Sequence, residues 1–205
     1  LKVNPNVKSK RFSKKVALIT VKTNLNGTIK VPVANDKALF LKQFLRQILI
    51  TPVIKSVELD MTVGPASATL NSNYMHFDNV SHPLSPQNVL VTSNATIPNF
   101  IPLYDFLLSQ NAPGTTIPIS TFYNGYYILF FFSDDGGSLN TSHVYRGLNG
   151  LSQPTKNTML VFASANDATA THEFIHTANL PHSFSAYEAS KFAKFTYEPH
   201  FTDNI

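Results

Sequence analysis

Residues 126–132 read Tyr-Tyr-Ile-Leu-Phe-Phe-Phe, the most apolar stretch of the chain, and decide how the rest can fold. The stretch is far shorter than the roughly 18 apolar residues of a membrane-spanning helix. Its aromatic side chains favour a strand over a helix. A short apolar run of this kind is typical of a strand covered on both faces, so we expect a central strand here.

Further strands are expected on both sides of this stretch. Residues 16–21 are short, apolar and β-branched, and residues 24–27 supply turn chemistry directly after them. Residues 158–163 form another apolar run, and residues 57–61 alternate apolar and polar side chains as a half-buried strand does. The sequence therefore predicts a sheet.

Helices are expected between these strands. Residues 36–49 place Phe40, Phe44 and Ile48 at four-residue steps, which predicts an amphipathic helix. Residues 101–110 predict a shorter helix, whereas residues 62–98 are rich in Asn, Ser, Thr and Pro and are expected to form loops with short strands. Alternating strands and helices predict an α/β or α+β domain built on a twisted mixed sheet.

The charge of the chain is concentrated at its start. Residues 1–15 hold six of the 16 basic residues and no acidic one, so ten basic and 12 acidic residues remain in 16–205. The first segment is therefore expected to be a basic linker, and 16–205 a single, nearly neutral domain. Such a domain offers no broad face for phosphate groups, so no nucleic-acid partner is expected.

The composition narrows the chemistry further. The 205 residues include 43% hydrophobic and 14% charged side chains, as in a globular protein. There is no cysteine, which excludes disulfides, thiolate metal sites and cysteine nucleophiles. No apolar run is long enough for a membrane span. No motif for an organic cofactor occurs.

The residues that carry chemistry lie near the C-terminal end. Residues 171–184 read Thr-His-Glu-Phe-Ile-His-Thr-Ala-Asn-Leu-Pro-His-Ser-Phe. On a helix, residues four apart lie one turn apart on the same face, so His172 and His176 can bind one metal ion. Asn166 or Asp167 can cap the start of this helix.

A third ligand is expected from His182. A helix continued from His172 would place His182 about 15 Å further along the axis, too far to share the metal. Asn179 tolerates the left-handed conformation that ends helices, and Pro181 cannot extend one, so the chain can turn back near residue 179. Three imidazoles leave the fourth position of a tetrahedral Zn²⁺ site open, as in catalytic zinc sites.

Glu173 is the expected catalytic residue. A water molecule in the open position would have its pKa lowered to roughly 7. Glu173 follows the first ligand and can accept the proton of this water as it attacks a peptide carbonyl. The same carboxyl group can then protonate the leaving amine.

The spacing of these residues resembles the zinc signature of the metzincins, His-Glu-x-x-His-x-x-Gly-x-x-His. His172, Glu173, His176 and His182 match it, and Asn179 replaces the glycine. The resemblance implies a metzincin-like zincin fold with an active-site helix. It also implies a zinc-dependent endopeptidase, a hydrolase that binds an extended polypeptide beside an edge strand.

The resemblance also carries expectations about the rest of the protein. Metzincins have a Met-turn beneath the metal, and this chain has no methionine after Met159, so we expect the natural protein to continue past Ile205. The basic linker and the missing cysteines resemble the C-terminal toxin domains of larger bacterial secretion proteins, such as type VI spike proteins. This implies a secreted or delivered bacterial effector.

Alternatives remain open at this point. A carboxylate or imidazole from Glu188, Glu198 or His200 could replace His182 as third ligand. Other candidate side chains are better explained by packing or by a place in a loop: Tyr187, Tyr197, His143, His76 and His82. The alternative function is a catalytically inactive zinc-binding domain or a loop-rich binding or assembly module.

Overall fold

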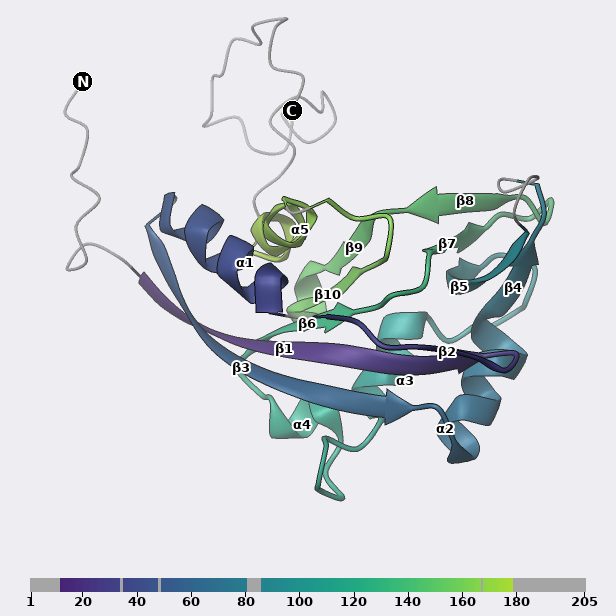
Figure 1. Ribbon diagram of the computed structural model, residues 1–205, viewed down its shortest axis with the longest axis horizontal. Coiled ribbons are helices and arrows are strands. Elements are labelled where there is room, and N and C mark those ends of the chain that lie inside the picture. Colours follow the sequence, from purple (N-terminus) through teal and green to yellow (C-terminus); the bar gives the residue numbers. More distant parts are fainter. Residues whose placement is uncertain (1–11, 34, 48, 81–85, 167, 179–205) are drawn as a thin grey trace, which may run out of the picture.

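The computed structural model describes residues 12–33, 35–47, 49–80, 86–166 and 168–178. This part of the chain forms a mixed α/β fold with two mixed sheets and a few helices (Figure 1). No helix in the described ranges is long and apolar enough to cross a membrane. The larger sheet contains β1 (Phe12–Leu25), β2 (Thr28–Lys30), β3 (Ile50–Met61), β6 (Tyr127–Phe131), β9 (Gly150–Gln153) and β10 (Thr158–Val161).

The larger sheet is parallel except at the strands β2 and β9. β1 pairs in parallel with β3 and β6, and β6 pairs in parallel with β10. β2 and β9 are antiparallel to their neighbours, and β9 lies at the end of the strand order β2-β1-β6-β10-β9. β1 begins at Phe12, before the expected start at Val16, because 12–15 pair with 50–53 of β3.

The strand expected at residues 126–132 is confirmed as β6, between β1 and β10. Its side chains alternate between two buried clusters. Leu129 and Phe131 belong to the cluster under α1 and α5, whereas Ile128 and Phe130 belong to the cluster on the opposite face. Burial on both faces explains why this stretch contains no polar residue.

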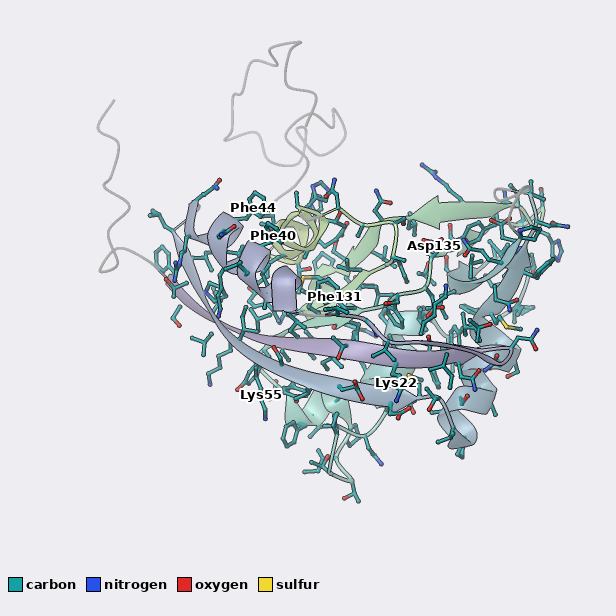
Figure 2. The ribbon with its side chains drawn as sticks, viewed as in Figure 1. Lys22, Phe40, Phe44, Lys55, Phe131 and Asp135 are labelled. Carbon is teal, nitrogen blue, oxygen red and sulfur yellow. The ribbon has the colours of Figure 1, made fainter. Side chains whose placement is uncertain are left out.

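Two helices cover one face of the larger sheet. α1 (Asn35–Gln47) confirms the helix expected from residue 36, and α5 (Thr169–Thr177) carries the histidine pair. They lie side by side in Figure 1. Leu41 and Leu45 of α1 are buried with Phe131, which Figure 2 shows below this helix layer. The face under α1 and α5 is therefore a closed apolar core.

The opposite face packs on α3 (Leu103–Ser109) and α4 (Ile119–Phe122). Leu103 and Leu107 are fully buried, which confirms the short helix expected at 101–110 and its apolar face. The ring of Phe106 stacks on Tyr74, with 4.9 Å between the ring centroids. This second core extends from the larger sheet to the smaller one, since Leu90 of the smaller sheet belongs to it.

The segment 62–98 is more regular than expected. α2 (Gly64–Thr69) and the π-helical turn η2 (Leu70–Tyr74) precede two strands, β4 (Met75–Asp78) and β5 (Gln87–Asn94). Leu70 and Tyr74, four residues apart, are both buried. The expectation of loops with short strands missed these helical turns because most of their other residues are small or polar.

β4 and β5 belong to the smaller sheet, which has the order β4-β5-β7-β8. Its other strands are β7 (Gly136–Leu139) and β8 (Tyr145–Leu148). β5 and β7 are parallel, and the outer strands are antiparallel to them. β8 leads directly into β9, so the smaller sheet is joined in sequence to the edge of the larger one.

Replacing Phe130 by alanine tests the central role of β6. Phe130 is 0% exposed, so Phe130→Ala should lower the free energy of unfolding by about 3–5 kcal/mol, the usual effect of deleting a buried ring. Phe77→Ala on β4 is the matched control, because this ring is 56% exposed. Urea unfolding followed by circular dichroism gives both values. Equal effects of the two changes would contradict the assigned core.

Candidate metal and catalytic site

α5 begins directly after a turn that Asn166 stabilises. The Asn166 Oδ1 atom accepts hydrogen bonds from the backbone N–H groups of Ala168 and Thr169, each at 3.0 Å, and from the Thr169 hydroxyl. These are amides that a helix start leaves without partners. Asn166 therefore stabilises the start of α5, the role expected of Asn166 or Asp167. Asp167 itself lies outside the described residues.

The two predicted metal ligands on α5 lie together. His172 Nε2 and His176 Nε2 are 3.0 Å apart, and their rings are nearly perpendicular at 86°. In a tetrahedral zinc site with Zn–N bonds of 2.0–2.1 Å, two ligand nitrogens are about 3.4 Å apart. A small rotation of the rings would reach this separation, so the pair fits a zinc ion.

The same pair can also form a direct hydrogen bond. A separation of 3.0 Å between Nε2 atoms is that of an N–H···N bond, in which one neutral ring donates and the other accepts. His172 is exposed and His176 is half-buried, so solvent can reach the site. Metal binding at both Nε2 atoms would require the ring proton of each neutral imidazole to lie on Nδ1, so the pair would give up this hydrogen bond.

Packing of α5 fixes the direction in which the histidines point. Ala170 and Phe174 are buried on the sheet side, where the Phe174 ring lies 4.7 Å from the Tyr127 ring of β6. The Thr177 hydroxyl donates to the Glu173 carbonyl at 2.8 Å, which satisfies this buried hydroxyl within the helix. Since the apolar stripe of the helix is held on the core, the histidines cannot rotate into it.

The Glu173 side chain extends from α5 to the edge strand β9. Glu173 is only 8% exposed, and Ser152 on β9 lies near enough to act on its carboxyl group. Burial raises the pKa of Glu173, while the Ser152 hydroxyl and the nearby His176 ring partly lower it. A buried carboxyl group with a raised pKa, next in sequence to a potential ligand, is a candidate for accepting and returning a proton.

The expected third ligand, His182, lies outside the described residues. So do the alternatives Glu188, Glu198 and His200, and the tyrosines Tyr187 and Tyr197. Within the part that the structure describes, no three His, Asp or Glu side chains come together to hold a metal. α5 ends at Thr177, two residues before the stop expected at Asn179, which itself is not described.

The remaining described histidines lie on the smaller sheet. His143 is exposed in the turn between β7 and β8, with a left-handed backbone at φ 60°. His76 lies on β4 and stacks on Tyr145, with 6.0 Å between the ring centroids. Neither joins a cluster of potential ligands among the described residues. The expected place of His143 in a loop is confirmed, whereas His76 lies on a strand and not in a loop. His82 lies outside the described residues.

The contacts of Glu173 with β9 were not predicted from the sequence. Ser152 lowers the pKa of its carboxyl group, and Gly150 lies against its side chain. Both residues precede Glu173 by more than 20 positions, so no local spacing links them to the motif. The sequence offers one weak signal, which is the stretch 150–153 of mixed polarity. It follows glycine and asparagine and precedes the buried strand at 158–161 by four residues.

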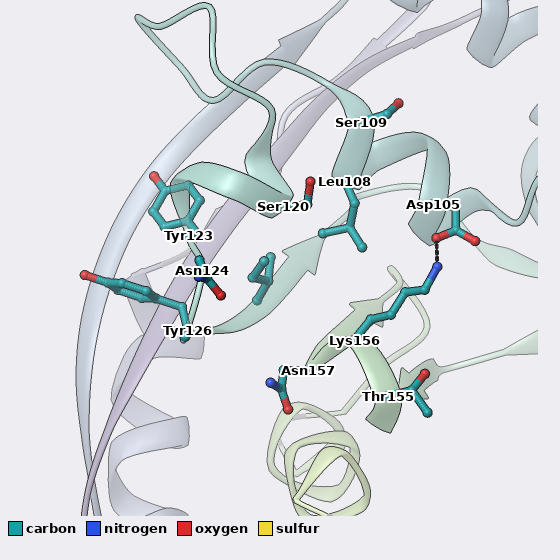
Figure 3. A pocket seen from close by; sticks show the side chains of 12 residues that line it. Asp105, Leu108, Ser109, Ser120, Tyr123, Asn124, Tyr126, Thr155, Lys156 and Asn157 are labelled. Carbon is teal, nitrogen blue, oxygen red and sulfur yellow. Dashed lines mark hydrogen bonds and ion pairs between the residues drawn. The ribbon is translucent and has the colours of Figure 1, made fainter.

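A pocket of about 470 Å³ lies on the other side of the larger sheet, beside α3 and α4 (Figure 3). An ion pair between Lys156 and Asp105 borders it, and the amides of Asn124 and Asn157 lie at its rim. None of the residues predicted to carry chemistry lines this pocket. The histidine pair and this pocket are therefore separate features.

Comparisons with known proteins add no assignment. No family model matches the chain, and neither a curated protein nor a solved structure matches it.

Glu173→Gln should stabilise the metal-free protein at neutral pH. Because burial raises the pKa of Glu173 in the folded state, the ionised form opposes folding. This penalty is absent below the ordinary pKa of 4.5, grows as the pH rises from there to the folded-state pKa, and is constant above it. Glutamine cannot ionise and therefore removes the penalty.

Urea unfolding in chelator, over buffers on both sides of that ordinary value, measures this effect. The advantage of the glutamine variant should be small in acid and increase towards neutral pH. An advantage that does not change with pH, or a less stable variant, would contradict the burial of an ionisable carboxyl group here.

Proposed function

We propose that the protein is a zinc-dependent endopeptidase whose catalytic base is Glu173. The observation that carries the proposal is the arrangement on α5: two imidazole nitrogens 3.0 Å apart, with a buried carboxylate next to them in sequence. A helix with only a structural role would gain nothing from this arrangement, because burying a carboxylate lowers the free energy of unfolding. Groups placed against stability in this way are typical of functional sites.

Each residue has one role in this proposal. His172, His176 and His182 would hold the zinc ion, which would supply Lewis acidity and a water molecule acidic enough to react near neutral pH. Glu173 would accept a proton from the attacking water. Glu173 would then return the proton to the leaving amine, so it would begin and end the cycle as a carboxylate.

The free edge of β9 is the proposed binding place for a polypeptide. Among the described strands, β9 pairs only with β10, and its four residues are all half-buried. An extended peptide can add to such an edge through backbone hydrogen bonds that do not depend on sequence. Because β9 packs beside α5, a peptide on this edge would pass close to the histidine pair.

The metzincin-like assignment forms part of the proposal. It is supported by the motif around His172 and by its place on a helix that packs on a mixed sheet. An antiparallel edge strand beside that helix also fits a peptidase that binds extended substrates. The departure from the family pattern is Asn179, which replaces the glycine.

The setting is proposed from the sequence alone. Six basic residues within 1–15 and the absence of cysteine fit a domain carried by a larger secreted bacterial protein, with the domain acting as a delivered effector. The polypeptide that it cleaves would then belong to the recipient cell.

Zinc content and cleavage test the central proposal together. The wild-type protein should bind roughly one zinc ion per chain and cleave an unfolded protein substrate. His176→Ala should lose zinc and cleavage together. Glu173→Gln should keep the zinc but lower kcat by about 10²–10⁴-fold, since it removes only the proton acceptor.

Metal analysis after dialysis and a fluorescence assay with a quenched peptide library provide the two readings. Zinc without cleavage in the wild-type protein would support the alternative, an inactive zinc-binding module. A wild-type protein that binds no zinc would end the peptidase proposal.

The third ligand can be identified separately. His182→Ala should weaken zinc binding at least about 100-fold, beyond the 10–100-fold effects of groups that only orient ligands. His200→Ala is the matched control and should leave the affinity unchanged. Competition with a zinc-binding dye measures both. If His200→Ala or Glu188→Gln is the damaging change instead, His182 is not a ligand.

A further inference from the structure

We propose that the edge strand β9 positions the catalytic carboxylate: the Ser152 hydroxyl holds Glu173, and Gly150 leaves the space in which its side chain lies. This inference rests on the proposed peptidase function and assigns a positioning role to two residues outside the motif. It follows from three observations on β9 and α5.

The first observation is the close approach of Gly150 to Glu173. A Cβ atom at position 150 would lie 2.7 Å from Glu173 Cγ and 3.0 Å from both Glu173 Oε1 and Thr169 Cγ2. Real Cβ atoms do not approach so closely, so any larger residue here would displace the glutamate. The backbone of Gly150 lies outside the left-handed region, so space and not conformation is what requires glycine.

The second observation is the side of β9 on which Ser152 lies. Residues two apart on a strand face the same side, so Gly150 and Ser152 both face α5. Leu151 between them packs in the core on the opposite face. The Ser152 hydroxyl is therefore on the side of the strand where Gly150 meets the Glu173 side chain, and it can donate a hydrogen bond to that carboxyl group.

The third observation is the register of β9 on β10. Gly150 pairs with Val161 and Ser152 pairs with Met159, and both partners belong to the core under α5. The strand is thus fixed relative to the helix by the sheet as well as by Glu173. Because the same strand offers its free edge to a peptide, the carbonyl to be attacked and the base would be placed by one element.

Kinetics on four variants test the proposal in the zinc-loaded protein. Ser152→Ala should lower kcat by at least about tenfold with KM and zinc content unchanged, and Ser152→Thr should restore most of the rate because it restores the hydroxyl. Gly150→Ala should lower kcat by about 10²-fold, as expected for a displaced catalytic group. Gly147→Ala is the matched control, since its added Cβ would find its nearest neighbour at 3.8 Å.

A double-mutant cycle tests the contact without metal or activity. In the metal-free protein, Ser152→Ala and Glu173→Ala should be coupled by about tenfold in the unfolding equilibrium constant, as measured by urea unfolding. If the wild-type protein cleaves nothing, the peptidase proposal fails while this cycle still decides whether Ser152 holds Glu173. Strictly additive effects in the cycle, or a Ser152→Ala variant with normal kcat, would overturn the inference.

Discussion

The outward direction of the His172 and His176 side chains depends on how α5 is held against the larger sheet. Ala170 and Phe174 lock one side of the helix into an apolar core, and Asn166 secures its first turn. Helical spacing alone brings side chains one turn apart together, and the packing turns the face that carries them away from the core. The exposure of the histidine pair to solvent is therefore a consequence of core packing.

The same packing buries Glu173, and burial is unfavourable for an ionised carboxylate. It lies on the side of the helix that turns towards β9, so it is removed from water although it is one residue from an exposed histidine. The Ser152 hydroxyl and the His176 ring offset only part of the cost of burial. Burial of Glu173 therefore lowers the stability of the fold at this position.

The sequence predicted the parts of the fold that have a clear hydrophobic period. β6 was recognisable because it is apolar throughout, and α1 because Phe40 and Phe44 recur at helical spacing. The helical turns of 64–74 were missed, since only Leu70 and Tyr74 among mostly small and polar residues mark their buried side. A weak period of this kind is decided by tertiary packing and not by local preference.

The candidate site was predictable to the same degree. The motif identified His172, Glu173 and His176 because helical spacing brings them together, whatever the rest of the chain does. Gly150 and Ser152 reach Glu173 only through the pairing of β9 with β10 and the packing of α5 on both. No spacing along the chain encodes such a contact.

The connection between the two sheets has a mechanical consequence. Asn149 alone separates β8 from β9, and its carbonyl accepts a hydrogen bond from the Phe162 amide at 3.0 Å. The link has almost no slack, and it is anchored at the end of β10. A displacement of β8 would therefore be transmitted through one residue to β9, the strand that contacts Glu173.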